Sequence, residues 1–184
     1  MGALRQIPHV EVIRLCTRNP VTLPQRFSAA TVEMLARHHP LFLHTHFNHP
    51  RECTPEAART LRALADRGIN CANQMVLLAG VNDDARIIRE VNVWLLRQRC
   101  RPYYLFQADL AQGISHFRVP VARGLEIMRA LRGPVSGMAV PTYVIDAPGG
   151  GGKIPMVPAY VESIDDESVT FRNWQGLPYT YPSR

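Results

Sequence analysis

Residues 146–153 carry the side chains with the clearest chemical potential in this 184-residue chain, reading Asp-Ala-Pro-Gly-Gly-Gly-Gly-Lys. Four consecutive glycines are uncommon inside a folded domain, because glycine loses the most backbone entropy on ordering and adds no side chain to pack. Apolar residues 140–145 predict a buried strand, which places Asp146 at the strand end where ligands bind in α/β proteins. Lys153 could there form a Schiff base with an aldehyde cofactor. The alternative is a flexible surface loop that happens to end in lysine.

A second carboxylate follows another predicted strand. Asp109 closes the segment 103–109, which places it at the same edge of the sheet as Asp146. Two carboxylates that converge there could act as an acid–base pair or bind an ammonium group. An aspartate after a strand is also commonly a turn or helix-capping residue, and this alternative stays open.

Histidines and amides form two further candidate groups. His44, His46 and His49 lie at the end of a predicted strand, where alternate histidines can bind a metal ion as in metal-dependent barrel hydrolases. A polar ligand-binding loop without a metal fits the same residues at least as well. Asn73 and Gln74 lie in an apolar run, and a buried amide needs hydrogen-bond partners. These two are therefore either structural amides or ligand contacts.

Strands that alternate with helices must position these groups. Strands are predicted over residues 10–15, 41–44, 71–78, 102–107 and 140–146. Helices are predicted after Ser28, at Thr54 and Pro55, after Asp83 or Asp84, and over 121–131. This order predicts an α/β fold with parallel strands, and both a doubly wound sheet and part of a (β/α) barrel fit. Residues 157–163 and 169–173 predict a terminal hairpin.

Composition predicts one ordinary globular domain over residues 1–184. Residues 1–146 form its β/α units, and 147–184 form the lysine loop and terminal strands. Hydrophobic residues make up 46% and charged residues 20%, and the net charge of +6 comes without a basic run that would indicate nucleic-acid binding. No signal peptide or membrane span is predicted, so we expect a cytoplasmic protein. The isolated cysteines contain no CxxC or CxxxCxxC motif and are expected to be small buried hydrophobes: Cys16, Cys53, Cys71 and Cys100.

Several blocks of sequence carry a family resemblance. They are residues 7–11 (Ile-Pro-His-Val-Glu), 23–26 (Leu-Pro-Gln-Arg), 45–50 (Thr-His-Phe-Asn-His-Pro), 73–74, 101–104, 116–118 and 146–155. In this order the blocks resemble the lysine 2,3-aminomutase family of radical S-adenosylmethionine enzymes. These isomerases move the 2-amino group of L-lysine to carbon 3, giving β-lysine. They use pyridoxal phosphate, S-adenosylmethionine and a [4Fe-4S] cluster.

The resemblance implies a role for each candidate residue. Lys153 is implied as the catalytic residue that holds pyridoxal phosphate as an aldimine. Asp109 and Asp146 are implied to bind the ammonium group of the substrate side chain. His46 and Gln74 match positions that contact S-adenosylmethionine. The implied fold is the C-terminal part of a partial (β/α) barrel, followed by a short hairpin of strands.

The chain also departs from the family pattern. The cluster-binding CxxxCxxC segment has no counterpart here. The chain is therefore expected to be a C-terminal fragment that is inactive alone. One possibility is that the N-terminal half is on another chain. Asp84 replaces a cysteine that helps to bind zinc in some members, so no metal site is expected. Phe106 replaces a tyrosine that is typical near the cofactor.

Three readings of function follow. The first is an aminomutase polypeptide, and the paired Asp109 and Asp146 favour free lysine over the glutamate or protein-bound lysine used by related enzymes. The second is a non-catalytic remnant that binds pyridoxal phosphate, and the third is a metal-dependent barrel hydrolase. The full-length family implies a homo-oligomer, and neither nucleic acid nor membrane is expected as a partner.

Overall fold

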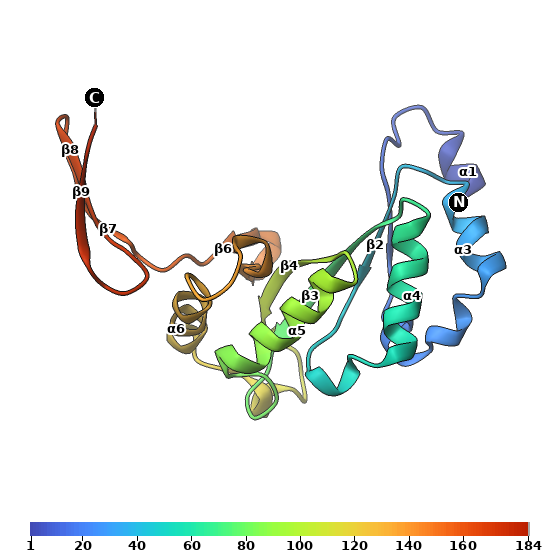
Figure 1. Cartoon of the computed structure of the whole chain (residues 1–184), viewed down its shortest axis with the longest axis horizontal. Coiled ribbons are helices and arrows are strands. Elements are labelled where there is room, and N and C mark those ends of the chain that lie inside the picture. The colour runs from blue at the N-terminus through green and yellow to red at the C-terminus, as the bar shows by residue number, and fades with distance from the viewer. Residues whose placement is uncertain (184) are drawn as a thin grey trace.

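The computed structural model describes residues 1–183, which form two β-sheets and the helices around the larger one (Figure 1). The first sheet has six strands: β1 (Ile13–Cys16), β2 (Leu41–Thr45), β3 (Asn70–Leu77), β4 (Cys100–Gln107), β5 (Thr142–Ala147) and β6 (Gly152–Pro155). The second has three: β7 (Val161–Ile164), β8 (Ser168–Arg172) and β9 (Pro178–Pro182). The α-helices are α1 (Gly2–Arg5), α2 (Asn19–Thr22), α3 (Ala29–Ala36), α4 (Pro55–Asp66), α5 (Ala85–Arg97) and α6 (Val121–Leu131).

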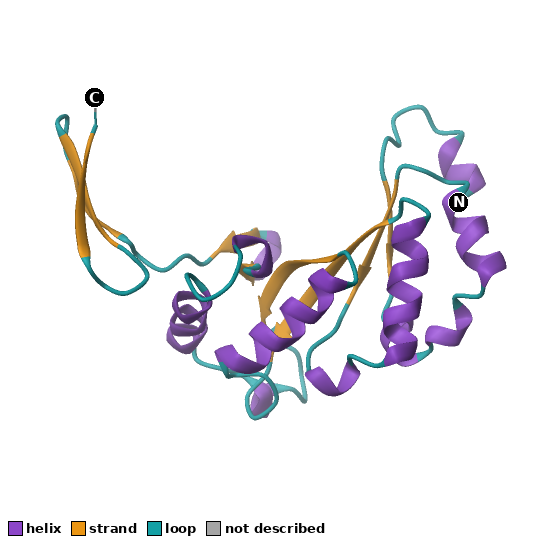
Figure 2. Ribbon diagram, viewed as in Figure 1, coloured by secondary structure: helices purple, strands orange, loops and turns teal. Residues whose placement is uncertain are grey.

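Strands β1 to β5 are parallel and lie side by side in chain order, whereas β6 pairs antiparallel with β5. The sheet is curled into half of a barrel, and the larger helices lie along one of its faces (Figure 2). The predicted α/β class with parallel strands is therefore confirmed. The other face of the sheet carries alternate side chains of each strand and holds the cavities described below.

The helices begin where the sequence provides capping side chains. Ser28 Oγ accepts a hydrogen bond from the backbone N–H of Thr31 at 3.2 Å, and Thr54 Oγ1 accepts one from Ala57 at 3.2 Å. Asp84 Oδ1 accepts a hydrogen bond from the backbone N–H of Arg86 at the start of α5. Each bond satisfies a backbone donor that has no partner inside the helix. The predicted helix starts are thus confirmed.

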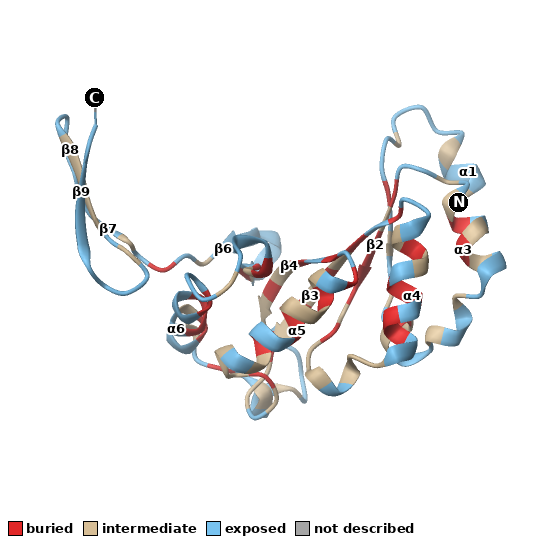
Figure 3. Ribbon diagram, viewed as in Figure 1, coloured by how far each residue is buried: buried red, intermediate tan, exposed pale blue. Residues whose placement is uncertain are grey.

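The hydrophobic core lies between the sheet and the helices (Figure 3). Burial alternates along β3, where Met75 and Leu77 face the helices and Gln74 and Val76 face the opposite side. Helices α4 and α5 complete the core with fully buried side chains, among them Leu61, Leu64, Ile88 and Leu95. Since this packing occupies only one face of the sheet, the other face is left for polar side chains.

The glycine run folds into a tight turn rather than an extended flexible loop. A single 3₁₀ turn over Pro148–Gly150 leads into β6, which places Lys153 directly opposite Asp146 on β5. Gly149 and Gly150 have φ angles of 69° and 82°, in the left-handed region that favours glycine. The glycines therefore serve a specific turn geometry, and the lysine is carried on a strand.

The second sheet projects from the body as an arm (Figure 1). The sequence predicts a hairpin here, but the structure has a third strand, β9. Prolines at both ends of β9 hide this strand in the sequence, because proline is unfavourable in most strand positions. The register places the larger apolar and aromatic side chains on one face: Val161, Ile164, Val169, Phe171, Tyr179 and Tyr181. The other face is mainly polar.

Two contacts hold the arm against the C-terminal end of α6. The Arg132 guanidinium lies 5.7 Å from the centre of the Tyr160 ring. The indole of Trp174 lies so close to Gly133 that a Cβ at this glycine would be 2.3 Å from it. Among residues 1–183, no helix has the length and apolarity needed to cross a membrane.

The packing of α6 on β5 yields a stability prediction. A Cβ on Gly124 would lie 2.4 Å from the Tyr143 hydroxyl, so Gly124→Ala should lower the free energy of unfolding by about 1–3 kcal/mol through overpacking. Urea unfolding measures the change. Gly137→Ala is the matched control, because nothing lies within 4 Å of its added Cβ. Equal stabilities of the two variants would contradict the close packing.

Candidate functional site

A pocket of about 310 Å³ opens at the carboxyl end of the six-stranded sheet. Its lining includes the five residues to which the family resemblance gives a role: His46, Gln74, Asp109, Asp146 and Lys153. They come from β3, β5 and β6 and from the segments that follow β2 and β4. Because parallel strands end at the same edge of a sheet, residues distant in the sequence meet there. The structure therefore brings these five side chains together, whereas His44, His49 and Asn73 do not line the pocket.

Lys153 and Asp146 form an ion pair inside this pocket. Lys153 Nζ donates to Asp146 Oδ1 at 2.6 Å, and the two side chains are 43% and 39% exposed. The pair follows from the antiparallel register of β5 and β6, which sets the two residues opposite each other. Lys153 Nζ also lies 4.9 Å from the centre of the Phe106 ring, within range of a cation–π contact. The amine thus lies between a carboxylate and an aromatic face.

Asp109 lies two residues beyond β4 and is exposed to solvent. Asp109 and Asp146 also line a second cavity, of about 480 Å³, together with Arg118. The two carboxylates therefore stand at the boundary between the two cavities. In the part of the chain that the structure describes, Asp109 forms no ion pair, which leaves its carboxylate open to a cationic ligand.

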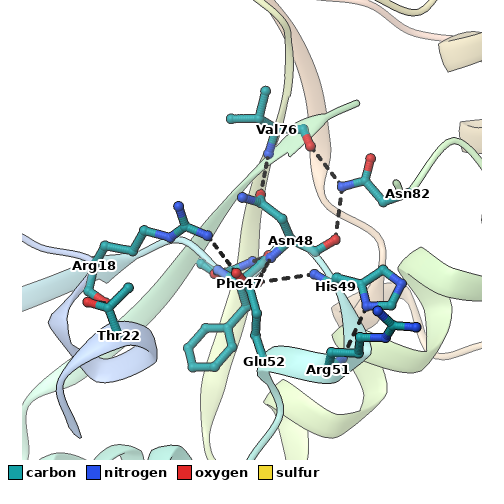
Figure 4. Close-up of polar contacts among 10 residues, drawn as sticks. Arg18, Thr22, Phe47, Asn48, His49, Arg51, Glu52, Val76 and Asn82 are labelled. Carbon is teal, nitrogen blue, oxygen red and sulfur yellow. Dashed lines mark hydrogen bonds and ion pairs between the residues drawn. The ribbon is translucent and has the colours of Figure 1, made fainter. Parts of the chain in front are cut away.

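His46 is partly buried beside charged neighbours. Burial lowers the pKa of His46, the nearby Arg18 guanidinium lowers it further, and Glu52 acts in the opposite direction. The ring is therefore neutral near pH 7, with one nitrogen able to donate and the other to accept a hydrogen bond. Glu52 itself is held by Arg18 at 2.5 Å and by the backbone N–H of Asn48 and His49 (Figure 4).

Asn73 is a structural amide, which resolves one of the alternatives that the sequence left open. Its side chain is buried and bonds both polar groups of Phe47, accepting from N–H at 2.7 Å and donating to C=O at 3.0 Å. Its neighbour Gln74 points to the opposite face and lines the pocket. The predicted pair thus divides into one structural residue and one candidate ligand contact.

The amides of Asn48 and Asn82 hold the adjoining loops (Figure 4). Asn48 Oδ1 accepts from Val76 N–H at 2.9 Å, and Asn82 Nδ2 donates to the carbonyls of Asn48 and Val76 at 2.9 and 2.8 Å. These bonds tie the loop after β2 to β3 and to the loop that precedes α5. His46 and Gln74 are thereby held on the same side of the sheet.

The histidines of the alternative metal site do not form a ligand set. Across residues 1–183, no group of three His, Cys, Asp or Glu side chains is arranged to hold a metal ion. His49 Nδ1 accepts a hydrogen bond from Arg51 N–H, and His44 lines a different cavity, nearer the amino ends of the strands. Burial lowers the pKa of His44, and Arg14 and His46 lower it further.

Four residues that line the pocket were not among the candidates from the sequence: Arg14, Cys16, Val76 and Gln107. Arg14 and Cys16 lie on β1 and point into it at alternate positions. Cys16 is exposed, so the expectation of a buried cysteine was wrong at this position; Cys71 and Cys100 are buried as expected, and Cys53 is partly buried. The alternation along β1 was the available signal. A further signal is that Lys153 is the only lysine in the sequence.

These side chains fit an aldehyde cofactor with an aromatic ring. Such a group needs a primary amine to bond with, and Lys153 supplies the sole side-chain amine of the chain within an open pocket. The Phe106 ring offers an apolar surface next to that amine. The carboxylates of Asp109 and Asp146 lie in the same pocket and complement a cationic ligand.

Comparisons with known proteins show which family the chain resembles. A family model described as "Lysine-2,3-aminomutase" matches residues 128–184. The chain is 51% identical over 181 residues to the L-lysine 2,3-aminomutase of Clostridium subterminale, covering 98% of this chain and 44% of that protein. It is 53% identical over 178 residues to the L-lysine 2,3-aminomutase of Acetoanaerobium sticklandii, covering 97% and 43%.

A relative with another named substrate also matches. The glutamate 2,3-aminomutase of Clostridioides difficile is 46% identical over 176 residues, covering 96% of this chain and 42% of that protein. The chain thus spans less than half the length of these curated relatives. The similarity extends over almost the whole of this chain. It shows that the chain belongs to the lysine 2,3-aminomutase family and matches the C-terminal portion of its members.

Proposed function

We propose that this chain supplies the substrate and pyridoxal phosphate part of a lysine 2,3-aminomutase, an isomerase that converts L-lysine to β-lysine by radical 1,2-amino migration. The observation that carries the proposal is the convergence of His46, Gln74, Asp109, Asp146 and Lys153 in one pocket. These residues lie on separate elements, so only the fold brings them together. Family membership supports the reaction class.

Each side chain has a defined part in this proposal. Lys153 holds pyridoxal phosphate, and His46 and Gln74 contact S-adenosylmethionine. When bound, pyridoxal phosphate supplies a π system that stabilises an unpaired electron next to the migrating nitrogen, and S-adenosylmethionine with a [4Fe-4S] cluster supplies the initiating radical. The protein binds and orients the reactants and excludes water from them.

The ion pair between Lys153 and Asp146 supports the assignment of Asp146 to a cationic substrate. The Lys153 side chain ends in the same alkylammonium group as L-lysine, and Asp146 binds it at 2.6 Å. When Lys153 engages the cofactor, Asp146 becomes free to receive the ammonium of the substrate. Asp109, at the same pocket, provides the second carboxylate.

The two carboxylates also favour lysine over glutamate as substrate. A glutamate side chain would bring a third negative charge into the pocket of Asp109 and Asp146, where like charges repel each other. A side chain without an ammonium group would leave hydrogen-bonding capacity unused. Amino-acid discrimination by such unpaired polar groups can be large.

The cluster ligands are proposed to come from polypeptide outside these 184 residues. The four cysteines of the chain occur singly, with no CxxxCxxC motif that would bind a [4Fe-4S] cluster. We therefore propose that turnover requires a cluster-binding segment in addition to this chain. The homo-oligomer implied by the family stays a prediction.

Reductive trapping tests the cofactor assignment. Incubation with pyridoxal phosphate followed by borohydride should attach one pyridoxyl group to Lys153, because it is the only lysine side chain. Peptide mass mapping locates the label. Lys153→Arg keeps the charge but cannot form the bond, so this variant should carry label at most on the Met1 amine. Label confined to Met1 in the wild-type chain would remove the assignment.

Substitution of the carboxylates tests the substrate assignment. Asp109→Asn and Asp146→Asn should each weaken L-lysine binding about tenfold, because a charge-assisted hydrogen bond contributes about 1.5–3 kcal/mol when shielded and less at an exposed site. Calorimetric or NMR titration measures the affinity. L-norleucine, which lacks the ammonium, should bind all variants alike, and Asp166→Asn in the exposed β7–β8 turn is the control. An unchanged affinity for L-lysine would contradict the role of these carboxylates.

A further inference from the structure

Asp109 and Asp146 lie beyond the point where their strands are joined by backbone hydrogen bonds. The parallel pairing of β4 with β5 ends at Phe106 and Val144. Past that pair the ladder no longer fixes the distance between the two segments. Beyond that pair, only side-chain contacts can link the segment after β4 to β5.

The side chains of Tyr143 and Gln107 supply such a contact. The Tyr143 hydroxyl donates to Gln107 Oε1 at 2.5 Å, and Gln107 Nε2 donates to the carbonyl of Val119 at 2.7 Å. The first bond joins β5 to the last residue of β4. The second closes the loop 108–119, which contains Asp109, back onto β4. One amide thus links both carboxylate-bearing segments.

Tyr143 is itself held rigidly. Its ring is 1% exposed and packs against α6 at Gly124, where no side chain would fit. Burial raises the pKa of Tyr143 to about 12, so the hydroxyl keeps its proton and remains a donor at neutral pH. Gln107 also lines both cavities that Asp109 and Asp146 line.

We propose that Tyr143 and Gln107 are positioning residues that set the spacing of Asp109 and Asp146, and so tune the site for a ligand with an alkylammonium group. This inference rests on the proposed function for the identity of the ligand. The role in spacing follows from the hydrogen bonds alone. Neither side chain takes part in the chemistry, and both act through the two carboxylates.

Hydrogen exchange of the wild-type chain and its variants tests the spacing role directly. Tyr143→Phe removes only the hydroxyl and keeps the packing on Gly124, so amide exchange over residues 108–119 should become about tenfold faster while exchange in α4 and β3 stays unchanged. Gln107→Met should have the same effect, and the double variant should add little, because both changes break one linkage. Tyr179→Phe on the arm is the control for loss of a tyrosine hydroxyl.

Ligand binding separates this inference from the proposed function. In Tyr143→Phe the affinity for L-lysine should fall about fivefold, the affinity for L-norleucine should not change, and borohydride trapping of pyridoxal phosphate at Lys153 should be unaffected. Unchanged exchange over 108–119 in both single variants would overturn the positioning role. If the wild-type chain binds no L-lysine, the substrate assignment fails, whereas the exchange rates still decide whether Tyr143 and Gln107 hold the loop.

Discussion

This structure depends on finding hydrogen-bond partners for the backbone N–H and C=O groups at the ends of the parallel strands. At that edge the ladder stops, yet the chain continues through segments that are only partly exposed to water. Buried N–H and C=O groups without partners are costly, so side-chain amides take the place of the missing strand neighbours. Asn73 bonds both polar groups of Phe47, and Asn48 and Asn82 extend the same scheme to Val76.

This scheme explains why the pocket can be polar without weakening the fold. The core is confined to the helix-covered face of the sheet, where Leu61, Leu95 and their neighbours are fully buried. The opposite face is free to carry Gln74, His46 and the charged residues. The core side chains and the pocket side chains thus lie on opposite faces of the same strands, because successive side chains along a strand point to opposite faces.

Charge pairing in the pocket connects the fold to the proposed chemistry. The register of β5 and β6 places the amine of Lys153 against Asp146, while Asp109 reaches the same pocket from the end of β4. A lysine that already binds one carboxylate shows that the pocket accommodates an alkylammonium group. The proposed substrate presents that same group, so the protein's own side chain and the substrate would use Asp146 in turn.

Local sequence signals determined much of the fold. The caps at Ser28, Thr54 and Asp84 and the strand–helix alternation follow from short-range physics, so the parallel sheet and its helices could be predicted. His46, Asp109 and Asp146 could be named as well, because they stand at the ends of predicted strands. The third strand of the arm could not be predicted, since prolines mask it.

Only the tertiary structure decided which side chains meet and what each of them does. The sequence could not separate Asn73 from Gln74, because neighbouring residues of a strand face opposite sides and only the packing of helices shows which side is the core. It could not show that Lys153 pairs with Asp146, since this pair depends on the register of β5 and β6. The sequence by itself determined the residue types and the element order. Strand pairing determined their juxtaposition, because contacts between distant residues form only once the chain is folded.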